Sequence, residues 1–115
     1  MSIWILQSQG ESPIILRIPP GSIKTIGRTA RADFIVDAAL VSRIHCRVTA
    51  DKSDQLVVED LGSTNGTIVN GKKFDRTILR PGDTLTIGRV DFQVGRGTEV
   101  FSTDLAKSVP EVAGS

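Results

Sequence analysis

Apolar and polar residues alternate along several short segments of this chain, with the two-residue period of a half-buried β-strand. The clearest case is 44–49, where the apolar residues Ile44, Cys46 and Val48 are separated by polar ones. This alternation places His45 on the face of the strand opposite Ile44. Other short apolar and β-branched runs lie at 14–16, 56–58, 85–87 and 92–94. Together these patterns predict about eleven short strands and no helix before residue 97.

Turn-forming residues separate the apolar runs, at 19–21, 51–54, 65–66, 70–71 and 81–83. Asn70-Gly71 is the strongest of these signals, because Asn-Gly favours the tight two-residue turn of a β-hairpin. Many short strands joined by turns predict an all-β fold, either a sandwich or a barrel.

The final stretch of the chain, from about residue 97, has a different pattern. Phe101, Leu105 and Val109 are spaced four apart and Pro110 follows them, a spacing that allows one or two helical turns. We favour the simpler interpretation of a linker or a frayed chain end. Because 115 residues are enough for one ordinary domain but not for two, we expect one domain at 1–96 and a C-terminal tail or linker at 97–115.

Charge and composition exclude several classes of protein. The 14 basic and 13 acidic residues nearly cancel, and the chain has 4% aromatic residues and no tyrosine, which argues against a nucleic-acid binder. The single cysteine excludes an internal disulfide, and with a single histidine it argues against a Cys/His zinc site. No run approaches ~18 apolar residues, and the first residues do not resemble a signal peptide. We therefore expect a cytoplasmic protein, or a nuclear one if the source is eukaryotic, without metal, cofactor or membrane insertion.

Three loop segments carry most of the candidate chemistry, at 26–28, 41–45 and 60–67, and each adjoins a predicted strand. Loops that adjoin strands gather at the rims of a sandwich, where function usually lies. Their side chains are mainly donors: the guanidinium groups of Arg28 and Arg43, the hydroxyls of Ser42, Ser63 and Thr64, and the amide of Asn65. Such donors suit a phosphate oxyanion, and Asp60 is the one carboxylate among them. The loops therefore predict a site that binds an anion without attacking it.

The order and spacing of these segments resemble the forkhead-associated (FHA) domain. The resemblance rests on Gly27-Arg28, then 42–45, then 62–67 and 69–71, and it extends from roughly residue 3 to residue 94. It implies an all-β sandwich of two twisted, mainly antiparallel sheets with about eleven strands, whose loops bind phosphothreonine peptides. The implied partners are phosphothreonine-containing segments of Ser/Thr kinases or of their substrates.

The resemblance also implies a role for each residue of the phosphopeptide-binding site. Arg28 contacts the phosphate through charge-assisted hydrogen bonds, and Ser42 donates its hydroxyl to a phosphate oxygen. Arg43 adds charge or a second contact. Thr64 lines the phosphothreonine pocket, and Asn65 holds the backbone of the bound peptide.

A second group of residues is implied to be architectural: Gly27, His45, Gly66, Asn70 and Gly71. We interpret His45 as a brace for the Ser42 loop, and Asn70-Gly71 as hairpin chemistry alone. Two preferences stay open for the residues that flank the phosphothreonine in the bound peptide. Leu40 suggests an apolar contact, whereas Lys72 and Lys73 would tolerate acidic neighbours.

Other functions fit the sequence less well. A hydrolase with Ser42 as nucleophile and His45 as base lacks the Gly-x-Ser-x-Gly elbow, and no P-loop follows 62–66. The main alternative is a phospho-independent interaction or oligomerisation module on the same fold. Arg28 together with Ser42 argues against that alternative, because a module blind to phosphate has no reason to carry both.

Overall fold

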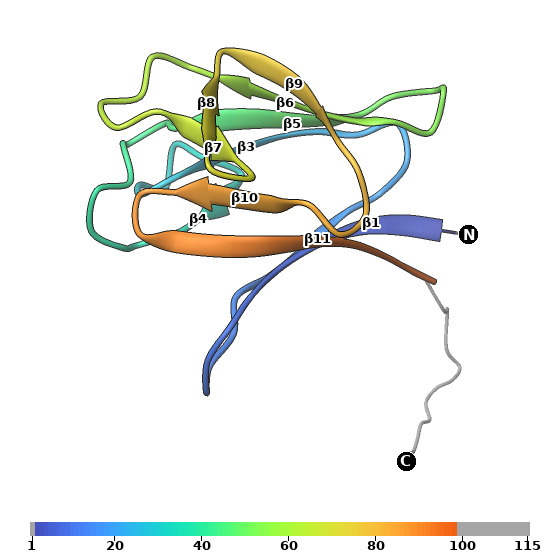
Figure 1. Ribbon diagram of the computed structural model, residues 1–115, viewed down its shortest axis with the longest axis horizontal. Helices are drawn as coiled ribbons and strands as arrows, with labels where there is room; N and C mark the ends of the chain where they lie inside the picture. The colour runs from blue at the N-terminus through green and yellow to red at the C-terminus, as the bar shows by residue number, and fades with distance from the viewer. Residues whose placement is uncertain (1, 99–115) are drawn as a thin grey trace.

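The computed structural model describes residues 2–98, and within them the chain forms eleven strands and no helix (Figure 1). The strands are β1 (Ser2–Ser8), β2 (Ile15–Ile18), β3 (Ile23–Gly27), β4 (Phe34–Ile35), β5 (Cys46–Ala50), β6 (Leu56–Asp60), β7 (Thr67–Val69), β8 (Lys72–Phe74), β9 (Arg76–Leu79), β10 (Thr84–Ile87) and β11 (Val90–Thr98). The prediction of an all-β fold of about eleven strands is confirmed. Nothing in 2–98 could therefore cross a membrane as a long apolar helix.

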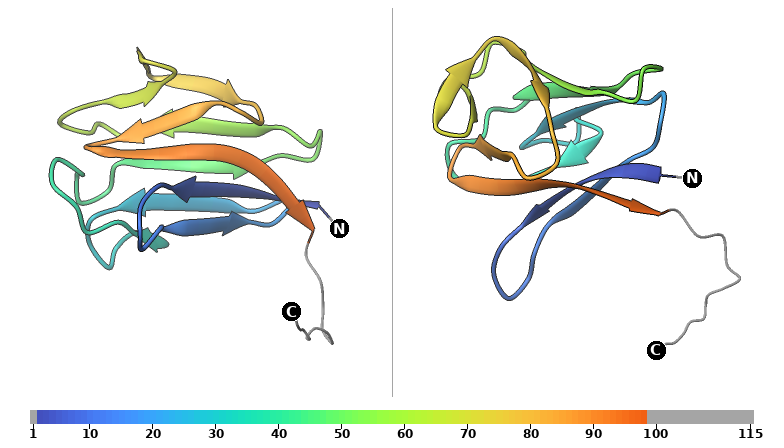
Figure 2. Two further views of the ribbon diagram at one scale, coloured as in Figure 1. Left: turned by 60° about the horizontal axis from the view of Figure 1, so that its bottom comes forward. Right: turned by 45° about the vertical axis from the view of Figure 1, so that its right-hand side comes forward.

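The strands form two sheets packed as the layers of a sandwich (Figure 2). One sheet has the order β2-β1-β11-β10-β7-β8, and the other has the order β4-β3-β5-β6-β9. Every pair is antiparallel except β3 with β4. The inner faces of both sheets supply the core, whose largest fully buried apolar side chains are Leu6, Ile18, Ile26, Leu56, Leu79, Leu85, Ile87 and Phe92. Of the two predicted architectures, the chain forms the sandwich.

The predicted alternation is right for β5 but wrong just before it. Cys46, Val48 and Ala50 are buried, whereas the residues between them are half-buried on the outer face. The strand begins only at Cys46, so that His45 is fully buried beside it and Ile44 is half-buried. Strand alternation does not reach His45 because this part of the chain bends into a connection.

The hairpin predicted at Asn70-Gly71 is confirmed. Val69 pairs with Lys72, and Asn70 and Gly71 have φ values of 50° and 84°, as a tight type I′ turn requires. The Asn70 side chain also ties this hairpin to the turn before β10: its Nδ2–H donates to Asp83 at 3.0 Å, and its Oδ1 accepts from a backbone N–H at 2.9 Å. The sequence pattern did not predict this second function of Asn70.

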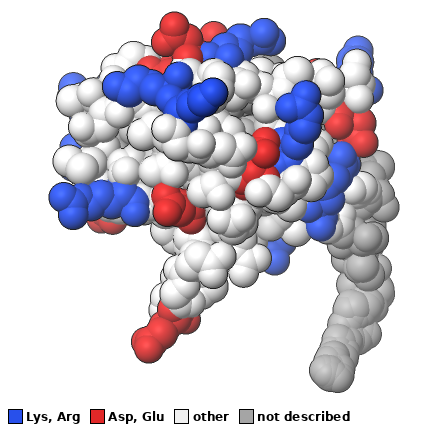
Figure 3. All heavy atoms as spheres, viewed as in Figure 1, with Lys and Arg blue, Asp and Glu red and all other residues white. Residues whose placement is uncertain are grey.

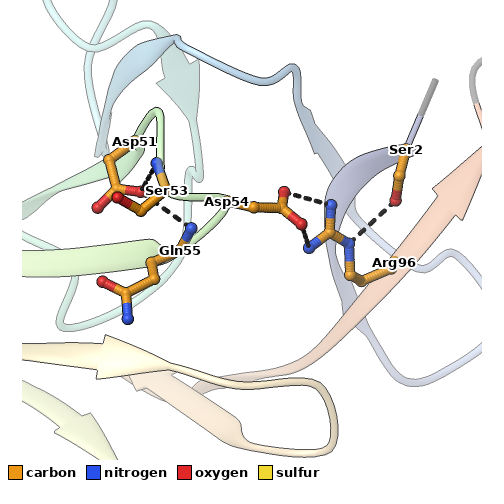
Figure 4. A network of polar contacts seen from close by, with 6 residues as sticks. All are labelled: Ser2, Asp51, Ser53, Asp54, Gln55 and Arg96. Carbon is orange, nitrogen blue, oxygen red and sulfur yellow. Dashed lines mark hydrogen bonds and ion pairs between the residues drawn. The ribbon is translucent and has the colours of Figure 1, made fainter.

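The first strand, β1, pairs along its whole length with residues 92–98 of the last strand, β11. Arg96 stacks over the Trp4 ring at 4.2 Å and forms a bidentate ion pair with Asp54, at 3.0 and 2.8 Å (Figure 4). These hydrogen bonds from Arg96 hold the pKa of Asp54 below its usual range. Strand β11 runs to Thr98, and the positions at 101–109 whose spacing allows helical turns lie outside the described residues. The division at residue 96 into domain and tail stays a prediction.

The fold gathers the loops of interest at one end of the sandwich. The β3–β4, β4–β5 and β6–β7 connections lie together at the left of Figure 1, away from the start of β1 and the end of β11. Three segments that are distant in sequence therefore converge at one rim.

Candidate functional site

Arg28 directly follows β3 and is held by two hydrogen bonds. Its backbone N–H donates to the carbonyl oxygen of Ser42, and its Nε–H donates to the carbonyl oxygen of Val41, both at 2.9 Å. Within residues 2–98, its terminal guanidinium nitrogens donate to no other protein group. The side chain is thus oriented through Nε, and its terminal nitrogens stay available for an oxyanion.

Ser42 lies half-buried on the connection between β4 and β5. Its Oγ accepts a hydrogen bond from the backbone N–H of Thr64 at 3.0 Å, which joins this connection to the β6–β7 connection. A hydroxyl oxygen that accepts such a bond still has its own proton to donate. Ser42 and Arg28 therefore present unused donors from two segments that are hydrogen-bonded to each other.

His45 connects the same two loops from beneath. It is fully buried, its Nδ1 accepts from the Ser42 N–H at 3.1 Å, and its Nε2 lies 2.8 Å from the carbonyl oxygen of Gly66. Because Nδ1 accepts, Nε2 carries the proton and donates to Gly66. This is the position that the predicted bracing role requires.

Replacing His45 by alanine is expected to lower the free energy of unfolding by about 1–3 kcal/mol, because the buried carbonyl of Gly66 and the partly buried N–H of Ser42 lose their partner. Thermal or denaturant unfolding measures this loss. His45→Asn, which keeps a donor and an acceptor, should lose less. An unchanged melting temperature combined with lost peptide binding would instead make His45 a ligand contact.

Asp60 organises the β6–β7 connection from the end of β6. Its carboxylate accepts from the backbone N–H groups of Gly62 and Ser63 at 3.0 Å, from the Thr67 hydroxyl at 2.7 Å, and from the Ser63 hydroxyl. Partial burial opposes ionisation of this carboxyl, but the hydrogen bonds outweigh it and hold the pKa of Asp60 below its usual range. Ser63 also accepts from the Gly66 N–H, so its hydroxyl serves the loop rather than a ligand.

The stability of the domain is expected to depend on the charge of Asp60. Its folded pKa lies below the unfolded value of about 3.9, so the carboxylate stabilises the fold above that pH and loses this contribution as pH falls through the folded pKa. Asp60→Asn should lower the free energy of unfolding by about 1–2 kcal/mol near pH 7. The gap between the two proteins should narrow below about pH 4. Denaturant titrations at several pH values measure the difference in free energy of unfolding between the parent and Asp60→Asn. If this difference stays the same in acid, the charge of Asp60 is not what stabilises the loop.

Asn65 reaches across the rim to the β4–β5 connection. Its Nδ2–H donates to the carbonyl oxygen of Leu40 at 3.1 Å, and its Oδ1 makes no hydrogen bond within 2–98. Leu40 has a φ of 70°, in the left-handed region that leucine rarely adopts, and its side chain is 48% exposed. Backbone strain of this kind concentrates at functional sites, where surrounding contacts hold it in place.

Arg28, Ser42 and Asn65 lie at one open hollow of about 440 Å³. It is lined by Arg28, Asp37, Ala38, Ala39, Leu40, Val41, Ser42, Thr64 and Asn65. Four of the five residues predicted to bind phosphopeptide are therefore together. The fifth, Arg43, lines a neighbouring hollow of about 360 Å³ that shares Arg28, Ser42 and Thr64 with the first. The second hollow also contains Arg31, which sequence reasoning missed although it stands only three residues after Arg28.

Some of the residues predicted to be architectural lie at the site, and the others lie in the β7–β8 turn. Gly27 is buried where β3 meets the Ser42 loop, and a Cβ atom there would lie 2.1 Å from the carbonyl oxygen of Arg43. Gly66 has a φ of 89° at the carbonyl that His45 binds. Asn70 and Gly71 lie in the β7–β8 turn and line neither hollow.

The arrangement suits binding better than catalysis. Nδ1 of His45 bonds to the Ser42 backbone N–H rather than to its Oγ, so this histidine is not placed to take the hydroxyl proton. A nucleophile needs its base within hydrogen-bond reach of the attacking oxygen. The free side-chain groups of Arg28, Ser42 and Asn65 are instead donors and one amide oxygen, which can hold an anion and a peptide backbone.

Comparisons with known proteins agree with this geometry. The family model described as the FHA domain matches residues 24–88. An ABC transporter ATP-binding/permease protein of Mycobacterium tuberculosis is 36% identical over 81 residues, covering 70% of this chain and 9% of that protein. The glycogen accumulation regulator GarA of the same organism is 37% identical over 68 residues, covering 59% of this chain and 41% of that protein. The chain spans less than half the length of these curated relatives.

Solved structures show the same likeness. A structure from a study of phosphothreonine-dependent FHA domain interactions superposes with a TM-score of 0.75 and 28% identity, covering 85% of this chain and 99% of that one. Mycobacterium tuberculosis EmbR in complex with a low-affinity phosphopeptide superposes with a TM-score of 0.70 and 26% identity, covering 85% of this chain and 26% of that one.

Proposed function

This chain belongs to the FHA domain family, and from that membership and the geometry of its loops we propose that it is a non-catalytic module that binds phosphothreonine-containing segments of other proteins. The partners are Ser/Thr kinases or their substrates. The observation that carries the proposal is the pair formed by Arg28 and Ser42. Each is oriented by bonds to the neighbouring loop, and each keeps an unused donor at the same hollow.

The phosphate binds between these two side chains. The terminal nitrogens of Arg28 donate charge-assisted hydrogen bonds to the phosphate oxygens, and the Ser42 hydroxyl donates another. Both donors are held in place before the ligand arrives, through Val41 and Thr64 respectively. Less ordering entropy is then lost on binding, which favours affinity. Arg43 adds positive charge from the adjoining hollow.

The peptide backbone binds beside the phosphate. Asn65 is held through its Nδ2–H by Leu40, so its unused Oδ1 can accept a backbone N–H of the ligand. The hollow is also lined by Ala38 and by the exposed Leu40, next to the donors. A threonine methyl group fits these apolar side chains, whereas the phosphate fits the donors.

The alternative of a phospho-independent interaction module explains less of this geometry. A module of that kind needs the bonds of Asp60 and His45 that shape the loops. It does not need guanidinium and hydroxyl donors left unused at one hollow.

The proposal predicts discrimination among phosphorylated residues. Phosphothreonine should bind at least several-fold more tightly than phosphoserine, because burying one methyl group contributes about 0.8 kcal/mol, or roughly fourfold. Phosphotyrosine should be rejected, because its ring holds the phosphate too far from the backbone for Arg28 and Asn65 to act together. One peptide made in three versions and titrated at one salt concentration tests this. Equal affinity for the first two versions would mean a plain anion patch without a methyl pocket.

A further inference from the structure

The two hollows at the rim differ in charge. The second hollow is lined by Arg28, Arg31, Ser42, Arg43, Ile44, Gly62 and Thr64, so it contains three arginines and no carboxylate. The first hollow contains one arginine, Arg28, together with the carboxylate of Asp37 and the exposed side chain of Leu40. Elsewhere, basic and acidic side chains are interspersed on the face that Figure 3 shows. The positive charge at the rim is therefore concentrated on one side of Arg28.

Arg31 is exposed and has no role in holding the loop. Within residues 2–98, its guanidinium forms no hydrogen bond and no ion pair, and only its backbone N–H has a partner, the Thr29 hydroxyl oxygen at 3.4 Å. That hydroxyl in turn donates to the carbonyl oxygen of Arg43 at 3.3 Å. The backbones that carry Arg31 and Arg43 are thus tied together, and the next residue, Ala32, is buried. The backbone of Arg31 is thus held in place, and its guanidinium is unpaired within residues 2–98.

One phosphate group does not account for all three arginines. A phosphothreonine carries a charge of about −1.5 to −2 near pH 7, which Arg28 and Arg43 together can balance. Arg31 then remains without a counter-charge in the same hollow. Guanidinium groups bind carboxylates and phosphates with the same planar fork.

We propose that Arg31 selects ligands that carry a second anionic group close to the phosphothreonine, on the side of Arg28 away from Leu40. The anionic group is an acidic side chain or a second phosphate, which share the oxyanion chemistry that a guanidinium recognises. This inference rests on the proposed function. On the other side, the carboxylate of Asp37 disfavours an acidic residue, and Leu40 offers an apolar contact.

The effect should be moderate for a carboxylate and larger for a phosphate. An exposed ion pair is a weak contact, so one glutamate at the favoured position should raise affinity about two- to fivefold. A phosphate carries more charge and more acceptor oxygens, so a second phosphate should raise affinity about tenfold or more. Both gains should shrink as salt is added.

The test uses the purified chain and a synthetic peptide with one phosphothreonine among alanine and glycine residues and with blocked ends. A glutamate is placed in turn at each position before and after the phosphothreonine, and each peptide is titrated at low and at high salt. We expect a gain on one side of the phosphothreonine only. Arg31→Ala should abolish that gain, which is measured in each variant against the affinity of the same variant for the parent peptide. Arg17→Ala, an exposed arginine on β2, is the matched control and should keep the gain.

A charge-reversal variant tests the proposed role of Arg31 more directly. Arg31→Glu should transfer the preference at the same position from glutamate to lysine. A second set of peptides carries phosphoserine where the first set carries glutamate. Comparing the affinities of the two sets shows whether the site prefers a carboxylate or a second phosphate.

The outcomes separate the two proposals. If the parent phosphopeptide does not bind at all, the proposed function fails. If it binds but no glutamate improves it, or if the improvement survives in Arg31→Ala, the role of Arg31 is overturned.

Discussion

Replacing Arg28 by alanine is expected to reduce affinity for a phosphothreonine peptide by about 10- to 150-fold, because a charge-assisted and partly bidentate bond to a dianion contributes roughly 1.5–3 kcal/mol. The side chain is exposed, so the fold should survive the change. Isothermal titration measures the affinity, and thermal unfolding checks the fold.

Two further variants control this experiment. Arg28→Lys should recover only part of the affinity, because lysine keeps the charge but lacks the fork and cannot reproduce the Nε–H bond to Val41. Arg17→Ala removes an equal charge from β2, which contributes no residue to either hollow, and should bind as the parent does. A folded Arg28→Ala protein with unchanged affinity would remove the basis of the proposed function.

Gly27→Ala is expected to damage both stability and binding. The added Cβ would lie 2.1 Å from the carbonyl oxygen of Arg43, and 2.8 Å from its carbonyl carbon, so backbone must move. Forced overpacking of this kind destabilises by about 1–3 kcal/mol, and contact with backbone favours the upper part of that range. The movement also separates Arg28 from the Ser42 loop, so phosphopeptide affinity should fall in the protein that remains folded.

The matched control for this variant is Gly95→Ala. A Cβ at Gly95 would meet no atom within 4 Å, and the residue does not have a positive φ. Denaturant titration should therefore find little change for Gly95→Ala and a clear loss for Gly27→Ala. Equal effects of the two substitutions would show that the close approach at Gly27 is unimportant.

Local patterns predicted most of the sandwich, because strands and turns are specified by nearby residues. The alternation in β5 and the Asn70-Gly71 hairpin are examples, since each depends on side chains within a few positions. At 44–45 the same reasoning failed, because His45 is buried by partners that lie 3 and 21 positions away.

The sequence did not predict which groups of the site are free, because their hydrogen-bond partners come from other segments of the chain. Motif order predicted which residues carry donors, but not which of those donors are used within the protein. Ser63 donates to Asp60 and is occupied, whereas Ser42 accepts from Thr64 and keeps its proton. The backbone of Leu40, which has a positive φ, accepts a hydrogen bond from Asn65, 25 positions away, and no local pattern signals this contact.

The measurement that tests the central claim most directly is a paired titration of the unmodified chain. One peptide is prepared with phosphothreonine and with plain threonine, and both are titrated under the same salt and pH conditions. The account predicts binding of the phosphorylated peptide and no measurable binding of its unphosphorylated twin, because Arg28 and Ser42 would lack the oxyanion that they are placed to bind. Equal binding of the two peptides would contradict the account and favour a phospho-independent module on the same fold.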